Sequence, residues 1–223
     1  MSYTLIIPIY NEERTVPSLI NKLNQLNSQI EVIIIDDGSN DDTNNLLIQN
    51  NNFTIIRNKI NQGKGNAIKK GISKAANQNI IIMDGDLEVD FNDIPMLIEK
   101  YEENNCNPLV GIRWGHNKYY PNIDLNFIGN YLINKLFNFL YKSNFNDVLC
   151  CVKILNTNLF KSLLLKSDGF NIEAEIMAKL ILKNQDVDEL QINYNRRTIT
   201  EGKKLRFSDS WSIIYTILKL RIL

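Results

Sequence analysis

Two acidic residues separated by one glycine follow an apolar run in the first half of the chain. Asp84-Gly85-Asp86 comes directly after residues 80–83, and alternate residues of an extended segment point to the same side. Both carboxylates can therefore approach one ion. Hard divalent cations take oxygen ligands and commonly bridge protein carboxylates to substrate phosphates. The pattern predicts Mg²⁺ or Mn²⁺ on Asp84 and Asp86, with Glu88 as a third ligand and a diphosphate on the metal.

A polar turn after a core strand is the alternative for this segment, because Asp and Gly are ordinary turn residues. The elements around it therefore matter. Short apolar runs rich in Ile and Val, typical of strands covered on both faces, occupy residues 5–9, 31–35, 53–56, 80–83 and 109–112. Apolar residues at helical spacing fill the gaps, as at Val16, Leu19 and Leu23.

Repeated strand–helix units predict an α/β fold: a Rossmann-like, mainly parallel sheet with right-handed crossovers and helices on both faces. Ligands of such sheets bind beyond the carboxyl ends of the strands. The segments that follow the first four strands are Tyr10-Asn11-Glu12, Asp36 to Ser39, Arg57 to Asn61 and Asp84 to Glu88. Three of these four segments carry acids, which favours a shared site over an isolated turn.

Composition narrows the classes of function. The chain has 223 residues, 44% of them hydrophobic, and 25 basic residues balance 25 acidic ones. This length predicts one domain, and the balanced charge gives no basic field for a nucleic-acid partner. The three cysteines lack metal-ligand spacing, and the chain shows neither a secretory signal nor an apolar run long enough to span a membrane. We expect a cytoplasmic protein with free thiols.

The second half has longer helical patterns, at residues 123–141 and 170–184, followed by a last strand at 187–194 and an amphipathic tail at 211–223. No linker or internal repeat separates the halves, so we expect a single domain over 1–223. The first long helix and the tail are candidates for a membrane interface, with core or dimer packing as the alternative. His116, the one histidine, is expected to be a loop residue.

Two further loops carry candidate ligand contacts. Asp41 or Asp42 is placed to cap the helix after the second strand, whereas Asp37 is a candidate for reading a nucleobase or ribose. Asn61-Gln62-Gly63-Lys64-Gly65 is not a P-loop, since Ser or Thr does not follow Lys64. It predicts a helix entry that depends on glycine, with Lys64 as a candidate phosphate contact.

These motifs together resemble family 2 glycosyltransferases of the GT-A fold. The matching segments are Pro8-Ile9-Tyr10-Asn11-Glu12-Glu13, Asp36-Asp37-Gly38-Ser39, Asn61 to Gly65 and Asp84-Gly85-Asp86. In the second half, Asp147 to Lys153, Glu173 to Leu180, Arg197-Thr198 and Glu201 to Lys204 are similar to the branch that contains dolichyl- and polyprenyl-phosphate hexose synthases. The resemblance covers residues 3–211, and although each motif is weak alone, their common order is specific for the family.

The resemblance implies a nucleotide-sugar and metal half at about residues 1–115 and an acceptor half at about 116–223. Pro8, Tyr10, Glu12 and Asp37 match segments that hold the nucleoside, and Asp84, Asp86 and Glu88 match metal ligands. Arg197 and Lys203 match a basic loop that closes over phosphates, and Asp147 and Lys153 match a motif on the acceptor side. Cys151 and Val152 depart from the family pattern there, which leaves the acceptor open.

The implied reaction moves a hexose, with inversion, from a UDP- or GDP-hexose to an acceptor, expected to be a polyprenyl or dolichyl phosphate at the cytoplasmic face of a membrane. A phosphate acceptor is already anionic and needs cations for positioning; the candidates are Arg113, Lys153, Arg197 and Lys203. A sugar hydroxyl or glycolipid acceptor would instead need a general base; the candidates are Asp147, Glu173 and Glu175.

Two other classes of protein compete with this interpretation. A nucleotidyltransferase would need a basic glycine-rich loop after the first strand, where Asn11-Glu12-Glu13 has the opposite charge. A non-catalytic sugar-nucleotide-binding protein would keep Asp37 but would not need Asp84, Asp86 and Glu88.

Overall fold

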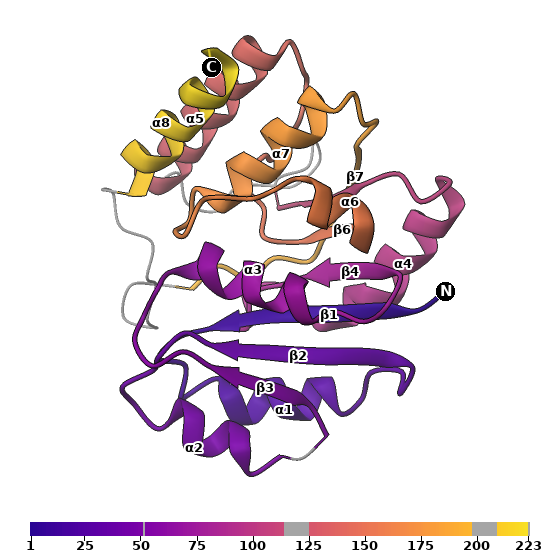
Figure 1. The fold of residues 1–223 in the computed structure, drawn as a ribbon, viewed down its shortest axis with the longest axis vertical. Coiled ribbons are helices and arrows are strands. Elements are labelled where there is room, and N and C mark those ends of the chain that lie inside the picture. Colours follow the sequence, from indigo (N-terminus) through magenta and orange to yellow (C-terminus); the bar gives the residue numbers. More distant parts are fainter. Residues whose placement is uncertain (51, 114–124, 198–208, 223) are drawn as a thin grey trace.

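The computed structural model describes residues 1–50, 52–113, 125–197 and 209–222, and its central feature is a seven-stranded sheet in the order β3-β2-β1-β4-β6-β5-β7 (Figure 1). The strands are β1 (Tyr3–Ile9), β2 (Ile30–Asp36), β3 (Thr54–Arg57), β4 (Asn79–Ile82), β5 (Leu109–Ile112), β6 (Lys153–Asn156) and β7 (Asp188–Gln191). All pairings are parallel except those of β6 with β4 and β5. The predicted α/β fold is confirmed, while β6 was not predicted.

The helices cover both faces of this sheet. They are α1 (Val16–Leu23), α2 (Thr43–Ile48), α3 (Lys64–Lys74), a short 3₁₀ turn η1 (Phe91–Asp93), α4 (Ile94–Glu103), α5 (Leu125–Tyr141), α6 (Thr157–Ser162), α7 (Ile172–Leu182) and α8 (Asp209–Ile222). The predicted helices at 123–141, 170–184 and 211–223 correspond to α5, α7 and α8, and the predicted last strand shortens to β7. None of the described helices has the length and apolar character that a membrane span requires.

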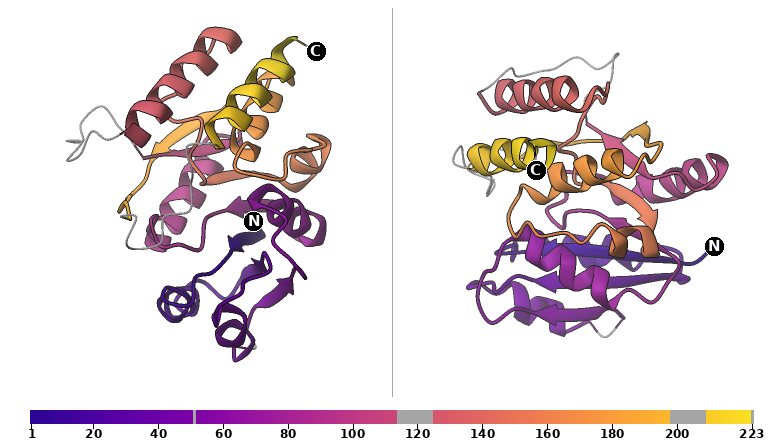
Figure 2. Two further views of the ribbon diagram at one scale, coloured as in Figure 1. Left: turned by 90° about the vertical axis from the view of Figure 1, so that its left-hand side faces the viewer. Right: turned by 45° about the horizontal axis from the view of Figure 1, so that its top comes forward.

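Alternation along β1 builds the core. Leu5 and Ile7 pack in one hydrophobic cluster with α1, α4 and part of α5, whereas Ile6 belongs to a second cluster with α3, α6 and α7. Side chains that alternate between two covered faces explain why this strand is apolar throughout. Figures 1 and 2 show α5 and α8 side by side at the end of the molecule away from α1 and α2.

The parallel register brings the ends of β1 to β4 to one edge of the sheet. Ile9 pairs with Asp36, and Asp36 pairs with Arg57, while the amide of Gly85 donates to the carbonyl of Pro8 beyond the end of β4. A side chain at Gly85 would meet Ile7, because its Cβ would lie 2.9 Å from Ile7 Cγ2. The segments that carry the predicted site residues therefore start from neighbouring positions.

Gly63 is the residue that lets the chain enter α3, as the sequence predicted. Its φ is +95°, a conformation that residues with a Cβ rarely adopt. A Cβ there would also lie 2.3 Å from the carbonyl oxygen of Asp168. Backbone from the two halves of the chain is in close contact at this point, next to Lys64.

We predict that Gly63→Ala lowers the free energy of unfolding by about 2–4 kcal/mol, because it adds backbone strain and a clash with a carbonyl group. Chemical denaturation followed by circular dichroism measures the change. Gly129→Ala in α5 is the matched control: nothing lies within 4 Å of its added Cβ, and the better helix propensity of alanine should leave stability unchanged or raise it by about 1 kcal/mol. Equal stability of Gly63→Ala and wild type would contradict this account.

Candidate active site

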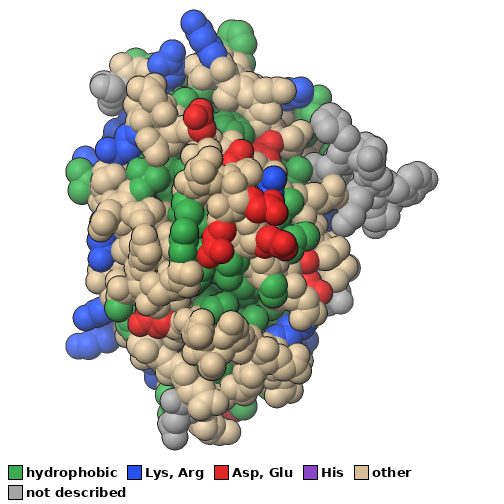
Figure 3. Space-filling model, turned by 90° about the vertical axis from the view of Figure 1, so that its right-hand side faces the viewer, with side chains coloured by type: hydrophobic (Ala, Val, Ile, Leu, Met, Phe, Trp, Pro, Cys, Tyr) green, Lys and Arg blue, Asp and Glu red, His purple; other side chains and the backbone are tan. Residues whose placement is uncertain are grey.

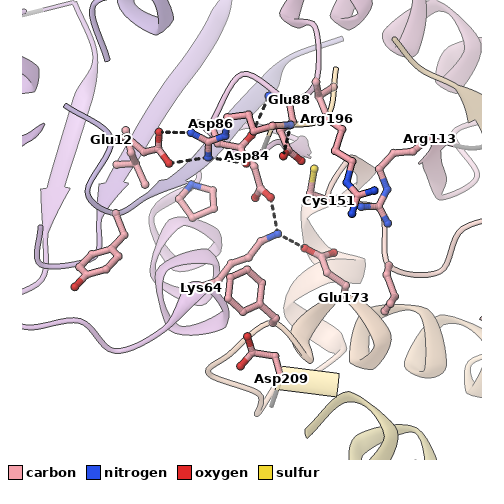
Figure 4. A pocket seen from close by; sticks show the side chains of 18 of the residues that line it. Glu12, Lys64, Asp84, Asp86, Glu88, Arg113, Cys151, Glu173, Arg196 and Asp209 are labelled. Carbon is pink, nitrogen blue, oxygen red and sulfur yellow. Dashed lines mark hydrogen bonds and ion pairs between the residues drawn. The ribbon is translucent and has the colours of Figure 1, made fainter. Parts of the chain in front are cut away.

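A cavity of about 640 Å³ lies beyond the carboxyl ends of the parallel strands, where both halves of the chain meet (Figure 4). Of the predicted site residues, it is lined by Pro8, Tyr10, Glu12, Asp37, Lys64, Asp84, Asp86, Glu88, Arg113, Glu173 and Arg197. Asp147 and Lys153 do not line it, and Lys203 and His116 lie outside the described residues. Most of the predicted set is therefore gathered around one space.

A second cavity, of about 620 Å³, lies beside the start of β1 and includes Met1, Tyr3, Glu99, Glu102 and Glu103. Figure 3 shows the face of the molecule that carries the N-terminus, where acidic side chains gather. This cavity sits at the amino ends of the strands, whereas ligands of parallel sheets bind at the carboxyl ends. The first cavity is therefore the candidate site.

Asp37 anchors the loop that leads into α3. Its carboxylate accepts hydrogen bonds from the side chain of Asn58 at 2.6 Å and from the amides of Gln62 at 2.9 Å and Gly63 at 2.7 Å. It lines the cavity but is almost fully buried. Asp37 thus shapes the wall where a nucleoside is expected, and direct contact with a base stays a prediction.

The helix cap after β2 comes from Asp41, which accepts the amide of Thr43 at 3.1 Å. Asp42 occupies the N-cap position of α2 but its side chain makes no capping hydrogen bond. Asp41 also accepts the amide of Glu13, so it ties the loop after β1 to the loop after β2.

Three acids follow β4, and each has a different environment. Asp86 accepts the amide of Glu88 and lies 3.3 Å from the guanidinium of Arg197. Glu88 is occupied on both oxygens, by the amide of Arg197 and the hydroxyl of Tyr194. Burial, together with the charges of Asp84 and Glu88, raises the pKa of Asp86 to about 7. Repulsion between close carboxylates of this kind is what a bound cation relieves.

The donor set fits a divalent ion that shares its coordination with a ligand. Asp84 Oδ1 is buried and has no hydrogen-bond partner among the described residues, and Asp86 lies two residues further along the same edge. No group of three or more acidic, Cys or His side chains in the described part of the chain is arranged to hold a metal. Tyr194 and Arg197 take both oxygens of Glu88 in this structure, and its role as a metal ligand stays a prediction. Mg²⁺ is commonly held by one or two carboxylates with substrate phosphates and water, so Asp84 and Asp86 suffice.

Arg197 connects the loop after β1 with the acids after β4. Its guanidinium contacts both carboxylate oxygens of Glu12, at 2.8 and 2.9 Å, as well as Asp86. Although burial opposes its charge, hydrogen bonds with Glu12 and the charge of Asp86 raise the pKa of Arg197. Glu12 thus positions this arginine and also lines the cavity, and its predicted contact with the nucleoside stays a prediction.

A buried ion-pair chain runs from the acids into the second half of the molecule (Figure 4). The ammonium of Lys64 lies 2.8 Å from Asp84 and 2.8 Å from Glu173, and Glu173 also pairs with Lys153. Although burial penalises both charges, the pKa of Lys64 is raised well above its usual value by Asp84 and Glu173, and the pKa of Glu173 is lowered by Lys153 and Lys64. Lys64 and Glu173 therefore remain ionised at neutral pH.

Arg113 reaches the cavity from the end of β5 and is held by Asp147. The carboxylate of Asp147 accepts hydrogen bonds from Nε and Nη2 of the guanidinium, at 2.8 and 2.9 Å, and from the amide of Arg113 at 3.1 Å. The guanidinium carbon lies 5.5 Å from the ring centroid of Tyr194. Asp147 therefore orients Arg113. The position of Asp147 is set by this ion pair and not by a place in the cavity wall.

Other lining residues from the second half of the chain were not among the predicted site residues; they are Phe127, Asn130, Leu149, Phe170, Tyr194, Arg196, Asp209 and Ile213. Arg196 adjoins the predicted Arg197, so its position carried a signal. The apolar residues gave no such signal, because apolar residues at helical spacing look the same in a sequence whether they line a cavity or pack in the protein core. Cys151, noted as a departure from the family pattern, also lines the cavity.

Comparison with known proteins agrees with this geometry. The model of the family described as "Glycosyl transferase family 2" matches residues 4–164. An uncharacterized protein of Methanocaldococcus jannaschii is 30% identical over 210 residues, which cover 87% of this chain and 90% of that protein. Dolichyl-phosphate beta-glucosyltransferase of Dictyostelium discoideum is 28% identical over 248 residues, covering 98% of this chain and 73% of that protein.

Among solved structures, glucosyl-3-phosphoglycerate synthase from Mycobacterium tuberculosis, in complex with Mn²⁺, UDP and glucosyl-3-phosphoglycerate, has the same fold. Its TM-score is 0.76 at 17% sequence identity, and the match covers 99% of this chain and 80% of that one. The fold is therefore of the GT-A type expected from the motifs. Since the family model covers most of the chain and the acids of its motifs line one cavity, this chain belongs to glycosyltransferase family 2, whose enzymes transfer a sugar from a nucleotide sugar.

Proposed function

We propose that the enzyme transfers a hexose, with inversion, from UDP- or GDP-hexose to a polyprenyl or dolichyl phosphate in a reaction that depends on Mg²⁺ or Mn²⁺. The choice of acceptor rests on the ion pairs of Asp147, Glu173 and Glu175, the acids that could act as a general base for a hydroxyl acceptor. Each of these acids is neutralised by a cation of the chain, whereas several arginines line the acceptor side of the cavity.

At the donor end, Pro8, Tyr10 and Asp37 form the wall for the nucleoside, and Lys64 lies where the diphosphate would meet the acids. Asp84 and Asp86 would hold the divalent ion. When bound there, the ion supplies charge neutralisation for the departing nucleoside diphosphate. The chain's own contribution is to fix the positions of these groups before the donor arrives, which lowers the reorganisation needed during transfer.

At the acceptor end, the candidate general bases are poor proton acceptors. Asp147 is paired with Arg113 through two hydrogen bonds. The pKa of Glu173 is lowered by Lys153 and Lys64, and that of Glu175 is lowered by Lys179 and by hydrogen bonds from Ser167, although burial acts in the opposite direction on both. A carboxylate with a lowered pKa takes a proton from a hydroxyl less readily, so this arrangement favours an acceptor that is already anionic.

Cations suited to a phosphate acceptor line the same cavity. Arg113, Arg196 and Arg197 are among its lining residues, and guanidinium groups match the geometry of phosphate oxygens. Helices α5 and α8 contribute Phe127, Asn130 and Ile213 to the wall of the same cavity. A phosphate held by the arginines would therefore have apolar surface next to it for a lipid chain.

The outer surface of α5 and α8 suits a membrane interface. Large apolar side chains are exposed on both helices; they are Ile128, Tyr131, Leu132, Phe139, Trp211, Tyr215, Leu218 and Ile222. Basic side chains lie over aromatic rings on the same surface, with Lys135 near Tyr131 and Lys219 near Tyr215. Aromatic and basic side chains beside apolar ones are typical of interfacial helices. We infer peripheral attachment to the cytoplasmic face of a membrane, with a homodimer as the competing explanation.

The identified relatives support a lipid-phosphate acceptor. The name of the Dictyostelium discoideum relative specifies a dolichyl phosphate, and another relative is a dodecaprenyl-phosphate galacturonate synthase that is 28% identical over 206 residues. A sugar hydroxyl acceptor within the same family is the alternative, and a non-catalytic nucleotide-sugar-binding protein is a second one.

We predict that Asp86→Asn reduces metal-dependent turnover by about 10²–10³-fold, because it removes charge where the leaving diphosphate and its cation would lie. Release of UDP or GDP is measured across a panel of donors with polyprenyl phosphate and MnCl₂. Asp42→Asn, an exposed acid whose side chain caps no helix, should behave as wild type. Turnover that does not require a divalent ion, or that survives in Asp86→Asn, would argue against the proposed donor site.

We predict that Arg196→Ala raises the KM for polyprenyl phosphate by about tenfold, because it removes a charge-assisted contact with the acceptor phosphate. The affinity for the nucleotide, measured by thermal shift, should not change. Arg14→Ala is the control, since Arg14 is exposed on the loop before α1. Efficient transfer to a neutral sugar, with no effect of Arg196→Ala, would move the assignment to a hydroxyl acceptor.

We predict that Leu132→Ser with Tyr215→Ser lowers binding to liposomes of anionic phospholipid by at least about fivefold, because two apolar contacts with the interface are lost. Sedimentation of protein with liposomes measures the binding. Ile48→Ser with Met96→Ser removes two exposed apolar side chains elsewhere and should have little effect. If sedimentation velocity instead shows a wild-type dimer that the first pair of substitutions dissociates, the surface is a subunit interface.

A further inference from the structure

Lys153 lies at the start of β6 and is completely buried. Its ammonium donates to the carbonyl oxygen of Cys150 and pairs with Glu173. It does not line the cavity, so it is not placed to touch an acceptor there, in contrast to the sequence-based expectation. Burying an ammonium group is costly unless its charge is compensated, so its position calls for an explanation.

Glu173 divides its charge between two lysines. One carboxylate oxygen pairs with Lys153, and the other lies 2.8 Å from the ammonium of Lys64. Glu173 is itself buried at the first turn of α7. One carboxylate between two ammonium groups gives the three residues a formal net charge of +1.

This net positive charge reaches the cavity only at Lys64. Lys64 and Glu173 line the cavity, and Lys153 lies behind them. In the structure, the surplus charge is balanced by Asp84, 2.8 Å from Lys64. Without Lys153, Glu173 would neutralise Lys64 by itself, and this pair would offer no surplus positive charge to an anionic ligand.

We propose that Lys153 is a positioning residue that acts through Glu173 to keep the charge of Lys64 available for the donor's diphosphate. By satisfying one oxygen of Glu173, Lys153 leaves Lys64 shared between Glu173 and Asp84. Lys64 can then exchange Asp84 for a phosphate oxygen without leaving its place. The proposal relies on a nucleotide diphosphate donor and is independent of the lipid acceptor.

The test is a charge-restoring pair of substitutions. Lys153→Met removes the buried charge, so that the charges of Lys64 and Glu173 sum to zero. Lys153→Met with Glu173→Gln restores a net charge of +1, which Lys64 carries. Isothermal titration with UDP and with uridine, and with GDP and guanosine, in saturating MnCl₂ gives the affinities. Circular dichroism melting curves establish that each variant folds.

We expect Lys153→Met to weaken binding of the tighter nucleoside diphosphate about five- to tenfold, from the loss of one nearby unit charge at a partly buried site. Its nucleoside should bind within about twofold of wild type, since it carries no phosphate. The double variant should regain the affinity for the diphosphate, and Lys153→Arg should keep it.

If the role of Lys153 were purely structural, the double variant would bind the diphosphate more weakly than Lys153→Met, because it removes one more buried polar interaction. A double variant as weak as Lys153→Met, or an unchanged affinity in Lys153→Met, would overturn the proposal. If Lys153→Met does not fold, Glu173→Gln decides: binding at least as tight as wild type supports the proposal, and weaker binding refutes it. Because no acceptor is present, these outcomes leave the choice of acceptor untouched.

Discussion

Several acids line one partly buried cavity, and such an arrangement is stable only if cations compensate for their repulsion and lost hydration. In this protein the cations come from distant parts of the chain. Arg197, far along the sequence, holds Glu12 and Asp86, and Lys64 joins Asp84 to Glu173 on the other side. The same ion pairs that make the acids tolerable also fasten the second half of the molecule to the first. A substrate that brings its own negative charge would compete for these cations, which explains why the site suits phosphates.

The charges are also sorted along the cavity. Acids gather at the end of β4, where a nucleotide diphosphate with its cation is expected, whereas Arg113 lies across the cavity from Glu12 (Figure 4). Asp147 contributes to this separation by holding Arg113 from behind. In the proposed reaction, an anionic acceptor would meet arginines fixed in advance by the fold, and the leaving diphosphate would meet Lys64 and the cation held by the acids.

The sequence predicted the parts of this arrangement that depend on local pattern. Apolar runs located five strands of the sheet and the acids that follow them, since strand period and burial leave a direct signature. It failed where the outcome depends on long-range pairing. Nothing local distinguishes Asp147 as a partner of Arg113 from Asp147 as a base, and nothing local shows that Lys153 turns away from the cavity toward Glu173. β6 was missed because its four residues begin and end with polar side chains, Lys153 and Asn156.

That unpredicted strand explains how the segment before it, which contains Leu149 and Cys151, reaches the site. Ligands gather at the carboxyl ends of parallel strands, and another parallel strand would deliver only its own carboxyl end there. β6 runs antiparallel between β4 and β5, with Lys153 opposite both Ile82 and Val110. Its amino end therefore lies beside the carboxyl ends of its neighbours, which puts Cys151 into the cavity wall and Lys153 directly behind it. One reversed strand thus lets residues that precede it in the sequence meet the acids that follow β4.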